Sequence, residues 1–194
     1  LGLLLTAIEY LTEKPQLKNI YFEGNIQSYT YADDGASLYD VLNLYNGKHE
    51  LIRDVLIKKM TNINDLEEYI DQTEDVQLSM MVEIVKEYGN EIPGIIKRLK
   101  DKHIDGNDKS KAEIIFSTVH RCKGMEYDSI HLVNDFITEE KIIQLKENSN
   151  QQFTIDKILE EINLLYVAIT RTKNLLYIPE KLLPATFISA PNIH

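Results

Sequence analysis

The spacing of apolar side chains predicts a helix, a strand and then a turn at the start of the chain. Residues 1–13 (LGLLLTAIEYLTE) have the apolar period of a helix, and residues 19–22 (NIYF) are typical of a short buried strand. We expect the strand to continue in an extended conformation to residue 31. Residues 33–35 (DDG) then predict a turn, after which the period changes.

A helical period dominates the chain from about residue 37 to residue 103. It predicts four or five short helices that are separated at residues with low helix propensity or turn preference, such as Gly47 and Pro93. The apolar positions that carry this period are Leu38, Val41, Leu42, Tyr45, Leu51, Val55, Leu56, Met60, Val76, Met80, Ile84, Val85, Ile92, Ile95, Ile96 and Leu99.

The last part of the chain returns to a strand period and then predicts one long helix. This helix begins at Asp156, a good N-cap residue, and carries Arg171 near its end. We expect one of its faces, with Ile162, Leu165, Ala168 and Ile169, to be packed. In chain order, the predicted segments are a strand at residues 114–118 (IIFST), a strand at 129–133 (SIHLV), a polar excursion at 137–153, the helix at 156–173 and a strand at 175–178 (LLYI).

This order of elements predicts an α/β fold in which a parallel-sheet lobe is interrupted by a helical insertion. Neither residues 1–24 nor residues 112–180 alone supply enough strands for a stable sheet, so we expect the two segments to form one discontinuous lobe. Residues 25–111 would be the insertion, and residues 181–194, which contain two prolines, would be a loosely held tail.

Composition and charge exclude several classes of protein. The net charge of the 194 residues is -10, which argues against a protein that coats nucleic acid electrostatically, although a local basic groove remains compatible with it. An acidic run at residues 61–82 and a basic run at 97–111 are typical of solvated faces. No stretch reaches the roughly 18 continuous apolar residues of a membrane span. The chain begins with Leu-Gly rather than Met, so we expect it to be an excerpt from a longer protein.

A single cysteine, Cys122, excludes an internal disulfide bond and a zinc site built from several cysteines. It favours a reducing compartment, which would be the bacterial cytosol or nucleoid, or the nucleus of a eukaryote.

Residues 117–126 (STVHRCKGME) form a segment suited to meeting phosphates. A strand that ends at Ser117-Thr118 and a tight turn that ends at Gly124 place side chains at the carboxyl edge of a parallel sheet, where open α/β sheets bind ligands. The side chains of Thr118, His120, Arg121 and Lys123 are hydrogen-bond donors for phosphate oxygens.

Other interpretations of this segment remain open at the level of the residues. It is not a P-loop, because lysine precedes glycine here, whereas the Walker order is GxxxxGK[ST]. A metal site with His120 and Cys122, a nucleophilic Cys122, or a surface turn with incidental charges would each fit the same residues, although no third ligand or catalytic partner has the required spacing.

Arg171 has two interpretations from its position alone. It could cap its own helix by donating to the last carbonyls, or a planar guanidinium on a rigid element could reach the γ-phosphate of a neighbouring nucleotide.

Taken together, "TVHRCKGMEYDSIHL" and "NLLYVAITRTKNLLYI" resemble motifs V and VI of superfamily 1 helicases of the UvrD/Rep type. The two motifs stand in the right order, about 40 residues apart. "IYFEGNIQSY" and Asn163 are similar to the branch that contains F-box DNA helicases. Departures from the usual pattern are mild and consist of Met125, Tyr127, Asn163 and Thr172.

The resemblance implies a role for each matching residue. Arg171 would be catalytic, reaching the γ-phosphate of ATP, and Glu126 would lie near the ribose of the nucleotide. Gly124 would shape the nucleotide-binding loop. The DNA-binding positions, which contact backbone phosphates, would be Thr118, His120 and Lys123.

The resemblance also implies partners and a mechanism. The discontinuous lobe would be the second RecA-like motor lobe of an ATP-dependent DNA helicase that moves 3′ to 5′ on single-stranded DNA and acts at junctions of single- and double-stranded DNA. ATP with Mg²⁺ would be bound mainly by an N-terminal lobe of the same protein, and without its Walker motifs this chain alone should be inactive. The alternative is a non-catalytic, helicase-derived module for protein interaction. We expect no metal site in this chain and no membrane partner.

Overall fold

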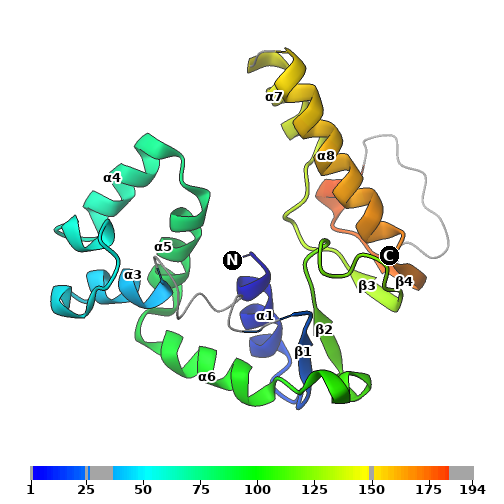
Figure 1. Ribbon diagram of the computed structural model, residues 1–194, viewed down its shortest axis with the longest axis horizontal. Helices are drawn as coiled ribbons and strands as arrows, with labels where there is room; N and C mark the ends of the chain where they lie inside the picture. Colours follow the sequence, from blue (N-terminus) through cyan, green and yellow to red (C-terminus); the bar gives the residue numbers. More distant parts are fainter. Residues whose placement is uncertain (1, 25, 27–36, 149–150, 184–194) are drawn as a thin grey trace. The chain divides into compact units, whose positions relative to one another are not determined.

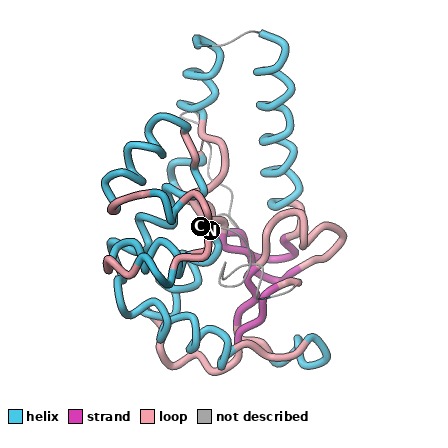
Figure 2. Tube along the Cα trace, turned by 60° about the vertical axis from the view of Figure 1, so that its left-hand side comes forward, coloured by secondary structure: helices cyan, strands magenta, loops and turns pink. Residues whose placement is uncertain are grey.

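The computed structural model describes residues 2–24, 26, 37–148 and 151–183, and the chain divides into two compact units (Figures 1 and 2). Unit 1 is Leu1–Phe116, and unit 2 is Ser117–His194. Both units combine helices with a short parallel pair of strands, which confirms the predicted α/β class. The turn predicted at residues 33–35 and most of the tail lie outside the described residues.

The helices of unit 1 begin at residues that can satisfy the free N-H groups of a first turn. Ser37 and Asp40 form a capping box, in which the Ser37 hydroxyl accepts from the Asp40 amide and the Asp40 carboxylate accepts from the Ser37 amide. Asn62 and Asp75 cap the next two helices with their side chains. The helices are α1 (Gly2–Glu13), α3 (Leu38–Tyr45), α4 (Ile63–Thr73), α5 (Val76–Tyr88) and α6 (Ile92–Lys102).

Residues 49–60 differ from the predicted helical pattern. They form two 3₁₀ turns, His49–Leu51 and Ile57–Lys59, and Val55 is 71% exposed. The Asp54 carboxylate accepts from the amides of Leu56 and Ile57, so that side-chain bonds replace those of an α-helix. The helical spacing of Leu51, Val55, Leu56 and Met60 was therefore misleading.

A parallel pair of strands joins the start and the end of unit 1. Strand β1 (Ile20–Phe22) pairs with β2 (Ile114–Phe116), with Ile20 opposite Ile114. The predicted extension of β1 is not seen at Glu23 and Gly24, which form a bend; residue 26 is helical.

Side chains from distant segments support β1 at both ends. The Glu113 carboxylate accepts from the amides of Lys18 and Asn19, and the bond from Asn19 is the main reason why the pKa of Glu113 is lowered. His103 Nδ1 accepts from the Phe22 amide at 3.3 Å. Burial lowers the pKa of His103, while Asp105 acts in the opposite direction. These contacts fix the register of β1 against the segment that follows α6.

The core of unit 1 is formed by the two strands and the inner faces of its helices. Ile20, Phe22, Leu4 and Leu38 are fully buried, and the Phe22 ring stacks on Phe116 with the ring centres 5.0 Å apart. The apolar period predicted these positions because each faces the inside of a helix or strand.

Unit 2 contains a second parallel pair of strands and two helices, of which the second is long. Its elements are β3 (Tyr127–His131), α7 (Glu139–Asn148), α8 (Gln151–Ile169) and β4 (Thr172–Tyr177). Strands β3 and β4 are parallel, and α7 and α8 pack side by side (Figure 2). A stacked pair, His131 and Tyr177, lies at the end of the strands, with ring centres 4.0 Å apart.

The helices of unit 2 begin earlier than the sequence predicts. The polar excursion contains α7, whose first turn carries Glu139 and Glu140 and where the Thr138 hydroxyl accepts from the Lys141 amide. Asp156 lies inside α8 and is not its N-cap. The helix ends at Ile169, because the chain from Thr172 onward pairs with β3 instead.

Helix α8 has more apolar surface than unit 2 covers. Ala168 is buried on the predicted packed face, whereas Ile162 is 43% exposed. A row of apolar side chains at helical spacing is exposed along α8 and consists of Ile155, Leu159, Ile162 and Tyr166. A helix that is apolar on more than one face is typical of a helix enclosed by further protein.

In the described part of the chain, no helix is long and apolar enough to cross a membrane.

Candidate functional site

The segment between β2 and β3 is a chain of tight turns. The Thr118 carbonyl accepts from the amides of Arg121 and Cys122, at 3.1 and 3.2 Å. The Cys122 carbonyl then accepts from the Met125 amide at 3.0 Å. The side chains of Thr118, His120 and Lys123 are exposed around these turns, as the prediction of DNA contacts requires.

Gly124 sits where the second turn needs a left-handed backbone. Its φ angle is +84°, and it is the third residue of the turn from Cys122 to Met125, a position that favours glycine. A Cβ atom there would meet nothing within 4 Å, so backbone conformation rather than crowding selects glycine. Gly124 places Lys123 and Glu126 on either side of one turn.

Cys122 is a packing residue of this loop. It is 8% exposed, and its thiol donates to the Val119 carbonyl at 3.3 Å. A small buried side chain in this position is consistent with a role in packing rather than with a catalytic nucleophile. Among the described residues, no group of three or more His, Cys, Asp and Glu side chains could hold a metal ion.

Arg171 connects the end of α8 to the loop. Its Nε donates to the Val167 carbonyl at 3.2 Å, as the helix-capping interpretation predicts. Its Nη1 also donates to the Met125 carbonyl at 3.4 Å, and its own carbonyl accepts from the Tyr127 amide at 2.8 Å. Arg171 lies two residues after the end of α8 and is half-buried, so these bonds fix its guanidinium beside the loop.

Glu126 has an ionic partner on β4. Lys173 Nζ lies 3.5 Å from Glu126 Oε2, and both side chains are largely exposed. Lys173 was predicted at the end of a helix, but it belongs to β4, whose register places Thr172 opposite Tyr127.

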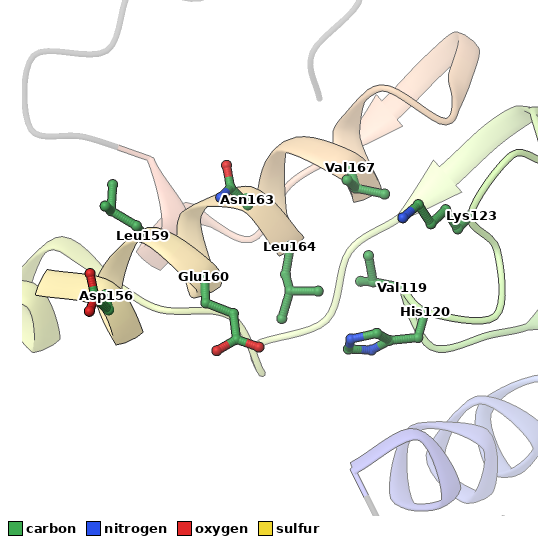
Figure 3. A pocket seen from close by; sticks show the side chains of 9 residues that line it. All are labelled: Val119, His120, Lys123, Asp156, Leu159, Glu160, Asn163, Leu164 and Val167. Carbon is green, nitrogen blue, oxygen red and sulfur yellow. The ribbon is translucent and has the colours of Figure 1, made fainter. Parts of the chain in front are cut away.

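His120 and Lys123 also line a surface hollow of about 390 Å³ against α8. Figure 3 shows Leu164 and Glu160 extending from α8 toward the side where Val119 and His120 lie. Asp156 lines the same hollow, so carboxylates from α8 share it with the two predicted DNA contacts. The remaining lining residues are Leu159, Asn163 and Val167.

The structure thus brings some predicted residues together and adds others. Arg171 reaches the loop at Met125, immediately before Glu126, whereas no hydrogen bond between described residues joins it to the side chains of Thr118, His120 or Lys123. Motif matching missed the roles of Lys173 and the Met125 carbonyl. Side chains alternate along a strand, so a strand predicted to begin at Thr172 would have indicated that Lys173 lies on β4 rather than on a helix.

The chain matches known proteins over most of its length. A family model described as UvrD-like helicase C-terminal domain matches residues 6–181. F-box DNA helicase 1 of Gallus gallus is 29% identical over 160 residues, which cover 76% of this chain and 15% of that protein. F-box DNA helicase protein 1 of Schizosaccharomyces pombe is 32% identical over 105 residues, which cover 52% of this chain and 11% of the relative. No solved structure matches.

Proposed function

Because this chain belongs to the UvrD-like helicase C-terminal domain family, as its motifs predict, we propose that it is the C-terminal motor portion of an ATP-dependent DNA helicase. The motor would couple ATP hydrolysis to movement along single-stranded DNA, in the 3′ to 5′ direction. The observation that carries the proposal is the hydrogen bond from the Arg171 guanidinium to the Met125 carbonyl, because it joins the two helicase motifs within unit 2.

Arg171 has the donors that a γ-phosphate requires. Three of the roughly five guanidinium N-H groups are used, by Val167, Met125 and Thr170. One N-H on each Nη atom remains for an incoming phosphate oxygen, and the bonds to backbone carbonyls restrict the guanidinium plane in advance. A cation held in this way stabilises charge that develops on the transferred phosphoryl group.

The other nucleotide contacts follow from the loop. Glu126 is exposed and would accept from a ribose hydroxyl, while Gly124 provides the turn that presents it. Residues of the other lobe would hold ATP and Mg²⁺, and the metal would neutralise phosphate charge there. Closure of the two lobes around ATP would bring Arg171 to the phosphate.

Single-stranded DNA would lie along the exposed corner of the same loop. Lys123, His120 and Thr118 offer a cation and polar donors to backbone phosphates, so we expect binding that depends on salt and little on sequence. The loop is only a few residues long between Lys123 and Glu126, so a shift of one end moves the other. The short loop between Lys123 and Glu126 would therefore couple the strength of DNA binding to the state of the nucleotide.

The same proposal includes the organisation of the lobe. Residues 1–24 and 112–180 would form the second RecA-like lobe, 25–111 the insertion near duplex DNA and 181–194 a tail. Support comes from the parallel pairing of β1 with β2 and from the exposed apolar row of α8, which a larger sheet would cover. The chain spans only 15% and 11% of the two helicases it matches, so the partner lobe would come from the rest of the full-length protein.

Lys123→Ala in the full-length protein tests the DNA contact. We expect weaker binding to single-stranded DNA and a salt slope of log K that is flatter by about 0.7, the value for one lost phosphate contact. Lys157→Ala, which removes an exposed lysine from α8, is the matched control and should leave the slope unchanged. Fluorescence anisotropy of a labelled oligonucleotide between 50 and about 200 mM salt measures both. Equal slopes for wild type and Lys123→Ala would contradict the phosphate contact.

A further inference from the structure

Strand β4 carries a second cation close to Arg171. Lys173 Nζ lies 3.5 Å from Glu126 Oε2. Lys173 is on β4, and Glu126 directly precedes β3, the parallel neighbour of β4 in the same unit. The side chains are 51% and 64% exposed, so the pair adds little to folding stability. The pair therefore directs attention to the effect of Lys173 on Glu126 rather than on stability.

The register of the strands makes this pairing specific. Thr172 lies opposite Tyr127, and the Tyr127 amide donates to the Arg171 carbonyl at 2.8 Å. Arg171 and Lys173 flank Thr172, so they can reach adjacent loop residues. Arg171 donates to the Met125 carbonyl, and Lys173 pairs with the Glu126 carboxylate. Two cations thus hold two consecutive residues of the loop.

We propose that Lys173 is a positioning residue that orients the Glu126 carboxylate for the nucleotide. This inference rests on the proposed function, which assigns Glu126 to the ribose. A glutamate side chain on an exposed loop samples many rotamers, and fixing one of them on binding weakens affinity. Lys173 binds Oε2 and leaves Oε1 to accept from a ribose hydroxyl. The pair thereby orients the carboxylate before ATP arrives.

The position of Lys173 predicts a defined kinetic change. Loss of an exposed ion pair weakens an interaction by up to about 1 kcal/mol, which corresponds to an increase of about two- to fivefold in KM for ATP. The value of kcat should stay within about twofold, because Lys173 acts on binding rather than on the transferred phosphoryl group. Arginine also pairs with carboxylates and should restore KM.

The experiment compares Lys173→Met, Lys173→Arg, Glu126→Gln and the double variant Lys173→Met/Glu126→Gln in the full-length protein. Lys181→Met, which removes an exposed lysine of the same unit, is the control. Steady-state ATP hydrolysis with saturating single-stranded DNA gives kcat and KM for ATP, 2′-deoxy-ATP and 3′-deoxy-ATP. Thermal unfolding of each variant checks that the fold is unchanged.

We expect both Lys173→Met and Glu126→Gln to raise KM for ATP and to reduce the preference for ATP over one deoxy analogue. The double variant should be no worse than Glu126→Gln, because Lys173 would act only through that carboxylate. Additive effects would overturn the inference, since Lys173 would then contact the nucleotide by itself. Wild-type KM in Lys173→Met together with a raised KM in Glu126→Gln would overturn this inference alone. Wild-type KM in both would overturn it together with the proposed ribose contact.

Discussion

The two units of the chain differ most in how their residues are buried. Unit 1 has a continuous core in which both strands and all its described α-helices take part. In unit 2, by contrast, the buried hydrophobic residues among those described are Cys122, Ile158, Ala168 and Leu176, and a row of apolar side chains on α8 is exposed. Unit 1 therefore has the packing of a self-supporting structure, whereas unit 2 leaves an apolar surface exposed, as protein-interaction surfaces do.

The long-range bonds of the two units differ in the same way. In unit 1 they include the bonds of Glu113 and His103, which accept from backbone amides in or next to β1 and to which we assign no role in the proposed chemistry. In unit 2 they include the bonds of Arg171 and Lys173, near the proposed nucleotide contacts, and one from Asn174 to Asp128. The residues that hold the loop of unit 2 in place are thus also the residues proposed to act.

Truncation of a buried and an exposed side chain should show the difference in packing most strongly. Phe22→Ala should lower the free energy of unfolding of unit 1 by about 3–5 kcal/mol, because Phe22 is fully buried against Phe116. Leu159→Ala, at a position 52% exposed in unit 2, should change stability by less than about 0.5 kcal/mol. Urea unfolding of the 194-residue chain, with hydrogen exchange to follow each unit, measures both. Equal losses of unfolding free energy in the two variants would contradict this difference, because they would show that the apolar row on α8 is covered by other residues.

Gly124→Ala should have an intermediate effect that is confined to unit 2. The φ angle of +84° is unfavourable for alanine by roughly 1–2 kcal/mol, although the space for a methyl group is open. We expect faster hydrogen exchange in residues 117–126 and weaker binding of both DNA and ATP, with unit 1 unchanged. Hydrogen exchange at the wild-type rate in this loop of Gly124→Ala would contradict the need for a residue that tolerates a positive φ angle.

The smallest effect should come from the titration of His103 in unit 1. Its pKa is lowered on folding, mainly by burial, so its contribution to stability is complete above its unfolded pKa of about 6.5 and is lost as the pH falls below that value. Protonation of Nδ1 would also remove the acceptor for the Phe22 amide. Urea midpoints at pH 7.5 and 5.5 should therefore differ more for the wild type than for His103→Gln. The same pH dependence in both would exclude His103 as the cause.

The sequence predicted unit 1 better than unit 2 for physical reasons. The period of apolar residues indicates helices wherever one face is buried, and α1, α3, α5 and α6 follow it. It failed at residues 49–60, where Asp54 binds backbone amides and replaces helical bonds. It failed again for α7 and the start of α8, which have polar first turns and therefore no clear apolar period.

The residues of the candidate site could be predicted from the sequence, but their positions on helices and strands could not. Motif matching selected Arg171 and Glu126, but the helix predicted at residues 156–173 from apolar spacing placed Arg171 and Lys173 inside a helix. Their actual positions depend on the pairing of β4 with β3, a contact between segments about 45 residues apart. The bond between Arg171 and the Met125 carbonyl follows from that pairing and from the turn at Gly124, which apolar spacing does not reveal.

The most direct test of the proposed motor is ATP turnover by Arg171→Ala in the full-length protein, with Lys157→Ala, which removes an exposed cation from α8, as the control. DNA-stimulated hydrolysis should fall by roughly 10³-fold or more in Arg171→Ala, with unchanged thermal unfolding, and should stay near the wild-type rate in Lys157→Ala. Arg171→Lys should restore little activity, because an ammonium group cannot reproduce the planar fork of the guanidinium. A folded Arg171→Ala protein that hydrolyses ATP near the wild-type rate would contradict the assignment of Arg171 to the γ-phosphate.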